Sequence, residues 1–130
     1  MTKYVVMFVL VLLAAGSAAQ TIALPADLAG TYAATGTGVG GTYTATAEII
    51  ARDKVYEVRW TFSDGSVMYG VGLVRDGLFI VGFNPGPGVS IYRVVRDKPM
   101  TLEAQWALWG ETQTYVERLT KGPPAIRAAR

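Results

Sequence analysis

The feature that most constrains the fold is a two-residue alternation of apolar and polar side chains, which recurs in short segments. In residues 55–62, aromatic and aliphatic side chains at the even positions alternate with mostly polar ones at the odd positions. Residues 42–49 and 101–108 show the same alternation. Successive side chains of a β-strand point to opposite faces, so each segment has one apolar and one wet face. This pattern predicts antiparallel strands.

Eight such segments, joined by turn-forming clusters, predict a series of hairpins. Asp-Gly at 64–65 and 76–77 supplies the positive φ angles of tight turns, and Pro85, Pro87 and Pro99 also fall in turns. Closing the sheet removes its two unpaired edges. We therefore expect an all-β, eight-stranded antiparallel up-and-down meander barrel of the calycin- or avidin-like kind, with the last strand beside the first; an open two-layer meander is the alternative. The predicted strands are 30–35, 42–51, 55–62, 66–74, 78–83, 89–95, 100–109 and 112–119.

Residues 36–41 read GTGVGG and match the G-x-G-x-x-G spacing of a dinucleotide-binding loop. Such a loop needs a helix behind it, whose N-terminal N–H groups receive the pyrophosphate. Here the next residues, 42–46, form an alternating β-branched segment, and helical periodicity is absent after residue 29. We interpret the motif as a hairpin loop.

The first 19 residues have the layout of a secretory signal peptide. Lys3 precedes an apolar run over residues 4–15, and small residues follow. The run of about 12 residues is shorter than the roughly 20 that span a bilayer. We expect cleavage after Ala19, a periplasmic or secreted location, and no transmembrane span afterwards. The predicted organisation is signal peptide 1–19, lead-in 20–29, one β-barrel domain 30–120 and a flexible basic tail 121–130.

Composition argues against several classes of function. Residues 20–120 contain 8 basic and 10 acidic groups, so no basic stripe is available for a nucleic-acid partner. The chain has no histidine and no cysteine, which removes the commonest catalytic base, nucleophile and transition-metal ligands. We expect no enzymatic activity, no catalytic residue, no metal and no cofactor.

The aromatic side chains on the apolar faces are the candidates for a ligand site. Inside a small barrel they either fill the interior or line a pocket for one small ligand. Glu117 shares a face with Tyr115, and if that face is interior its carboxyl group needs a partner. Arg93 or tyrosine hydroxyl groups could provide one, whereas a rim position in water is the alternative. The candidate ligand-binding residues are Tyr43, Tyr56, Trp60, Trp106, Tyr115, Glu117 and Arg93.

Segments 66–74 and 78–83 are apolar on both faces. A barrel wall that faces water does not need a second apolar face. We therefore expect a cover from the lead-in, the tail or a second copy of the chain, which would form a homodimer through strands 66–83.

Spaced aromatic and glycine residues recur along residues 30–119. They include Gly41-Thr42-Tyr43-x-Ala45, Val55-Tyr56-x-Val58-x-Trp60, Gly70-Val71-Gly72-Leu73 and Val89-x-Ile91-Tyr92-x-Val94, with Trp106 and Glu117-x-Leu119. This set resembles small exported bacterial β-barrel proteins catalogued as fibronectin-binding or uncharacterised, and the resemblance implies an extracellular-matrix partner. The chain departs from them in having GTGVGG in place of a polar loop, Ala104 in place of glycine, and Tyr115-Val116-Glu117 in place of Gly-Thr-Glu.

Two functions remain open on this basis. One is a barrel that binds a small apolar or aromatic ligand inside, which a cavity above about 300 Å³ would favour. The other is a surface interaction module that binds an extracellular-matrix or envelope protein, or inhibits an enzyme. A filled interior with an apolar patch on strands 66–83 would favour the second.

Overall fold

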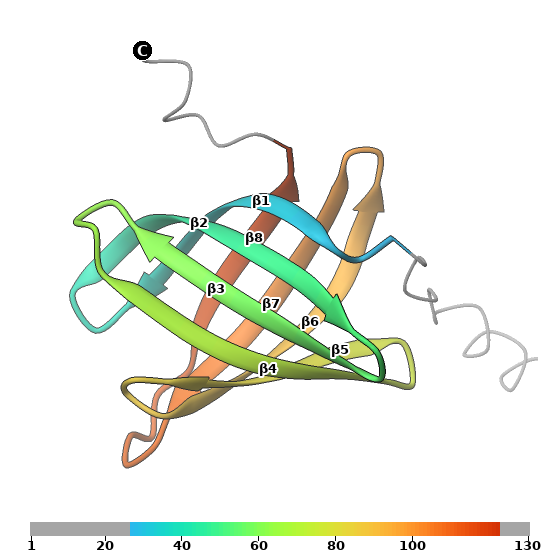
Figure 1. The fold of residues 1–130 in the computed structure, drawn as a ribbon. Helices are drawn as coiled ribbons and strands as arrows, with labels where there is room; N and C mark the ends of the chain where they lie inside the picture. Colours follow the sequence, from blue (N-terminus) through green and yellow to red (C-terminus); the bar gives the residue numbers. More distant parts are fainter. Residues whose placement is uncertain (1–26, 123–130) are drawn as a thin grey trace, which may run out of the picture.

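The chain forms a closed barrel of eight antiparallel strands, each paired with its neighbours in sequence (Figure 1). The structure, a computed structural model, describes residues 27–122. The predicted signal peptide, and parts of the predicted lead-in and tail, lie outside the described residues. Among those that are described, no helix is long and apolar enough to cross a membrane. The strands are β1 (Gly30–Gly38), β2 (Gly41–Arg52), β3 (Val55–Phe62), β4 (Val67–Arg75), β5 (Leu78–Asn84), β6 (Gly88–Asp97), β7 (Met100–Leu108) and β8 (Tyr115–Lys121).

The predicted up-and-down barrel is confirmed, including its closure. β1 pairs with β8 from Tyr32 opposite Lys121 to Gly36 opposite Glu117. Every strand therefore has a partner on both sides, and no sheet edge is left free within the barrel. The open two-layer alternative is excluded.

The GTGVGG motif lies in a hairpin, as predicted, but most of it is strand. Pairing between β1 and β2 continues to Gly38 opposite Gly41, so the turn itself is Val39-Gly40. Gly41 has a φ of 111°, a conformation that side chains rarely adopt. The backbone ladder continues through glycines because hydrogen bonding to β2 does not depend on side chains. At the other end of the chain, β8 begins at Tyr115, three residues later than predicted.

The half of the barrel that carries the two described ends of the chain is tightly packed. Leu28, from the predicted lead-in, is almost fully buried there, and the Tyr32 hydroxyl donates a hydrogen bond of 2.6 Å to its carbonyl oxygen. The largest fully buried side chains are Tyr32, Tyr92, Phe79, Leu28, Ile49, Leu102, Leu119 and Val81. We call the half of the barrel that carries the two described chain ends the closed half. Most of these side chains occupy inward positions in it or next to it.

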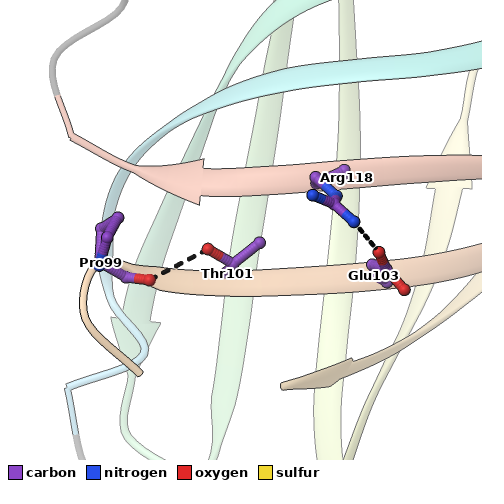
Figure 2. Close-up of polar contacts among 4 residues, drawn as sticks. All are labelled: Pro99, Thr101, Glu103 and Arg118. Atoms are coloured by element: carbon purple, nitrogen blue, oxygen red, sulfur yellow. Dashed lines mark hydrogen bonds and ion pairs between the residues drawn. The ribbon is translucent and has the colours of Figure 1, made fainter. Parts of the chain in front are cut away.

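The outer wall differs from one side of the barrel to the other. Ion pairs join Glu48 to Arg59 between β2 and β3, at 2.8 Å, and Glu103 to Arg118 between β7 and β8. Figure 2 shows the second pair beside the Thr101 hydroxyl, which donates to the Pro99 carbonyl oxygen. The outer face of β4–β6 instead exposes apolar side chains. We call this surface the outer apolar face; it consists of Tyr69, Val71, Leu73, Val89 and Ile91.

Candidate functional site

The barrel interior is open at the end opposite the described chain ends. The β1–β2, β3–β4, β5–β6 and β7–β8 turns lie together at this open end, on the left in Figure 1. A cavity of about 300 Å³ lies there. Small residues at inward positions, Gly38 and Ser90, leave the space that larger side chains would fill. The cavity is lined by Gly38, Val39, Gly40, Gly41, Thr42, Tyr43, Trp60, Phe62, Met68, Phe83, Ser90, Trp106 and Glu117.

Glu117 occupies the middle of a row of five inward positions on neighbouring strands. In register, Tyr43 on β2 lies opposite Gly36 on β1, and Gly36 lies opposite Glu117 on β8. On the other side, Glu117 lies opposite Ala104 on β7, which lies opposite Tyr92 on β6. The row therefore alternates large and small side chains. Each tyrosine can reach Glu117 because the strand between them carries only a glycine or an alanine.

Three donors converge on the Glu117 carboxyl group. The Tyr43 hydroxyl donates to Oε1 at 2.6 Å, and the Tyr92 hydroxyl donates to Oε2 at 2.5 Å. From across the barrel, Trp60 Nε1 donates to Oε2 at 3.2 Å. Glu117 is only 6% exposed, so these contacts replace most of its hydration. A carboxylate has about four acceptor positions, and the one that remains belongs to Oε1.

Burial dominates the electrostatics of this cluster. Desolvation raises the pKa of Glu117 above its ordinary value, although the hydrogen bonds from Tyr43, Tyr92 and Trp60 oppose the shift. Burial and the neighbouring Glu117 charge also raise the pKa values of both tyrosines, which therefore keep their protons and remain donors. Among the described residues, no lysine or arginine lines the cavity. The site is an acid that lacks a basic partner.

The structure brings four of the predicted ligand-binding residues to the cavity: Tyr43, Trp60, Trp106 and Glu117. The prediction that tyrosine hydroxyl groups hold an inward Glu117 is confirmed, and a rim position in water is excluded. Two further candidates lie elsewhere. Tyr56 packs edge-on against Phe79 in the closed half, with ring centroids 5.5 Å apart. Tyr115 lies at the rim, 4.7 Å from Trp106, and its hydroxyl donates to Glu111.

Arg93 is on the opposite side of the wall from Glu117. It is exposed and lies opposite Glu103 in the β6–β7 register. Of the two candidate partners of Glu117, Arg93 is therefore the wrong one and the tyrosine hydroxyl groups are the right one. The inward face of β6 carries Ser90 and Tyr92 instead. Pairing across the β5–β6 hairpin could have revealed this face, because inward Phe83 lies opposite Gly88 and therefore puts the even-numbered residues of β6 inside.

Sequence reasoning also missed Tyr92 as a hydrogen-bond donor to Glu117. It missed four residues of the cavity walls as well: Phe62, Met68, Phe83 and Ser90. Ring contacts hold these walls in place. Phe83 meets Trp106 and Trp60 edge-on, each with centroids 5.9 Å apart, and Tyr43 meets Phe62 at 5.5 Å. Edge-to-face pairs of this kind add stability beyond area burial, so the walls are formed before any ligand arrives.

The arrangement can recognise a ligand by stacking and by hydrogen bonding to one carboxyl group. Within residues 27–122, no group of three or more His, Cys, Asp or Glu side chains is placed to hold a metal ion. Glu117 has hydroxyl and indole donors as neighbours rather than a second carboxyl group. The cavity therefore has the features of a binding pocket: mostly apolar walls with a few polar groups, among them one carboxyl group that hydrogen bonds hold in a fixed orientation.

The comparison with known proteins assigns the chain to no family. No protein-family model matches it, and no curated protein is significantly similar to it. The resemblance to exported proteins catalogued as fibronectin-binding therefore stays a prediction.

Proposed function

We propose that this protein is an exported, non-enzymatic binding protein that holds a small apolar or aromatic ligand in the open half of its barrel. The observation that carries the proposal is the cavity of about 300 Å³ with aromatic walls and one buried carboxyl group. Its volume is at the lower end of the range for small-molecule sites, about 300–1,000 Å³. The tightly packed closed half holds the cavity walls in position, which lowers the entropic cost of ordering their side chains when a ligand binds.

Native mass spectrometry of the protein purified from its producing cells tests this proposal. We expect a fraction of the protein to carry extra mass that is released on denaturation. Gly38→Leu should abolish the extra mass, because the new side chain would extend from β1 toward Trp106 in the cavity; a Cβ on Gly38 already lies 3.5 Å from that ring. Thr61→Leu adds the same side chain on the exposed face of β3 and serves as the control.

The proposal also predicts binding of the neutral apolar fluorophore N-phenyl-1-naphthylamine. Its emission should rise with the native protein and with Thr61→Leu, and should fall sharply with Gly38→Leu. Protein that carries no extra mass and does not bind this probe would refute the proposed function.

A second function is favoured by the outer apolar face. Val71 and Leu73 are each 55% exposed and Tyr69 is 60% exposed, on a side of the barrel where residues 27–122 provide no cover. A surface interaction module would use this face to bind an extracellular-matrix or envelope protein, or an enzyme, or to form a homodimer through strands 66–83.

Sedimentation equilibrium distinguishes the dimer from the monomer. If the outer apolar face forms a homodimer, the native protein sediments with twice the chain mass and Val71→Glu sediments as a monomer, because an isolated carboxylate cannot be buried in the interface. Gly38→Leu should leave the mass unchanged. A native protein that is monomeric at all concentrations would remove the homodimer from consideration.

A further inference from the structure

We propose that the ligand of this cavity is a small organic cation, an ammonium group on an apolar or aromatic body, with the ammonium group hydrogen-bonded to Glu117. This inference rests on the proposed function, since it names the class of ligand for the same cavity. It depends on three features: an acceptor position left free, a charge that lacks a partner, and aromatic walls.

The free acceptor position is on Glu117 Oε1. Oε2 already receives hydrogen bonds from Tyr92 and Trp60, whereas Oε1 receives one from Tyr43. Glu117 also lines the cavity, so a donor on the ligand can approach it from that side. An acceptor at the floor of an apolar cavity selects ligands that carry an N–H or O–H group.

Within residues 27–122, no cationic side chain reaches Glu117 inside the barrel. The inward positions beside it, Gly36 and Ala104, have no charge, and the groups that reach it are neutral phenols and an indole. Arg118 is next to Glu117 in β8, but it lies on the outer face and pairs with Glu103 (Figure 2). A cation from the ligand would provide the missing counter-charge, whereas an anion would be repelled.

The cavity walls favour a cation as well. Five aromatic rings line the space, and their faces carry negative electrostatic potential that attracts ammonium groups. Those rings belong to Tyr43, Trp60, Phe62, Phe83 and Trp106. A neutral ligand would gain the same burial of apolar surface, but neither the pairing with Glu117 nor this attraction to the rings. The aromatic walls and Glu117 therefore both favour a cation.

Three probes of nearly equal size separate charge from shape: 2-phenylethylamine, 2-phenylethanol and 3-phenylpropionate. Binding to the purified protein is measured at neutral pH by isothermal titration calorimetry. We expect the amine to bind at least about tenfold more tightly than the alcohol, and the carboxylate to bind most weakly. In Glu117→Gln the amine should lose this advantage and bind like the alcohol.

Glu48→Gln is the matched control, because it removes a carboxylate from the outer wall, where Glu48 pairs with Arg59. It should keep the full preference for the amine. Equal binding of amine and alcohol to the native protein, or an amine preference that survives in Glu117→Gln, would overturn the cation assignment and leave the proposed function intact. Absence of binding by all three probes and by N-phenyl-1-naphthylamine, together with purified protein that carries no extra mass, would refute both.

Discussion

Gly36 lies directly beneath the phenol of Tyr43, with no room for a side chain between them. A Cβ on Gly36 would be 2.5 Å from the Tyr43 hydroxyl oxygen and 2.6 Å from the Val116 carbonyl oxygen. The tyrosine crosses this position to reach Glu117 on the next strand. One glycine of the GTGVGG motif therefore lies in a strand and makes room for the hydrogen bond from Tyr43 to Glu117.

Gly36→Ala should destabilise the protein because Tyr43 or the β8 backbone must move to admit the methyl group. We expect a loss of about 1–3 kcal/mol in the free energy of unfolding, measured by urea denaturation. Gly38→Ala is the control on the same face of β1, since its Cβ would meet Trp106 at an ordinary 3.5 Å. Equal stability of the two variants would contradict the close approach.

Tyr92→Phe should weaken the folded state by removing one of the three donors to Glu117. Both residues are buried, so the carboxyl group loses a hydrogen bond that water cannot easily replace. The expected cost is about 1–3 kcal/mol in urea denaturation. Tyr115→Phe removes a hydroxyl that bonds Glu111 on the surface and should have no measurable effect. A Tyr92→Phe variant as stable as the native protein would show that the contact contributes nothing.

Glu117 should make the stability of the native protein depend on pH. Its pKa is raised by burial, so the folded state keeps this proton to a higher pH than the unfolded chain, which releases it near the ordinary value of 4.5. The folded state then binds more protons, and the free energy of unfolding falls as the pH rises from 4.5 through the folded-state pKa. The stabilising contribution of protonated Glu117 to the free energy of unfolding is fully present below pH 4.5 and is lost above the folded-state pKa.

The pH effect is measured as the difference in free energy of unfolding between the native protein and Glu117→Gln, from pH 3.5 to 8. Relative to the variant, the native protein should become less stable as the pH rises. Glu48→Gln, which alters the outer wall only, controls for the general effect of removing a carboxylate. A constant difference across this range would refute the buried-acid assignment.

The two halves of the barrel should respond differently to truncation of a ring. Phe79 is fully buried among packed side chains, and Phe79→Ala should cost about 3–5 kcal/mol in urea denaturation. Phe83 borders the cavity, so Phe83→Ala removes fewer packing contacts and should lower the free energy of unfolding by less than Phe79→Ala does. Because Phe83 forms part of the cavity wall, its truncation should also weaken ligand binding. The reverse order of stabilities would mean that the open half is the better packed one.

Alternation and turn residues predicted the strands well because both are local properties. The 55–62 segment matches β3, and the other strands differ from their predicted bounds by one to three residues. The remaining errors come from pairing between strands. β1 extends to Gly38 because β2 provides hydrogen-bond partners for it, and no local propensity indicates this for glycine.

The site was harder to predict because β6 has two plausible inward faces. One face carries Val89 and Ile91 with Arg93, and the other carries Ser90 and Tyr92. Composition does not separate them, since both mix apolar and polar residues. The hairpin register decides, and it buries Tyr92 while it leaves Arg93 in water. Glu117 was found because a carboxylate on an otherwise apolar face is rare and needs a partner.

The described ends of the chain meet at the closed half, where Lys121 Nζ donates to the Asp27 carbonyl oxygen at 2.6 Å and the Gly122 amide donates to Thr31. A short peptide could therefore join the two ends, and a new start could be opened in the Val39-Gly40 turn without breaking any strand pair. The same geometry makes the barrel a convenient sensor module. In the chain with its native connectivity, a fluorophore or a surface attached beside Asp27 or Gly122 would lie at the opposite end of the barrel from the cavity. The cavity would stay open to the solution.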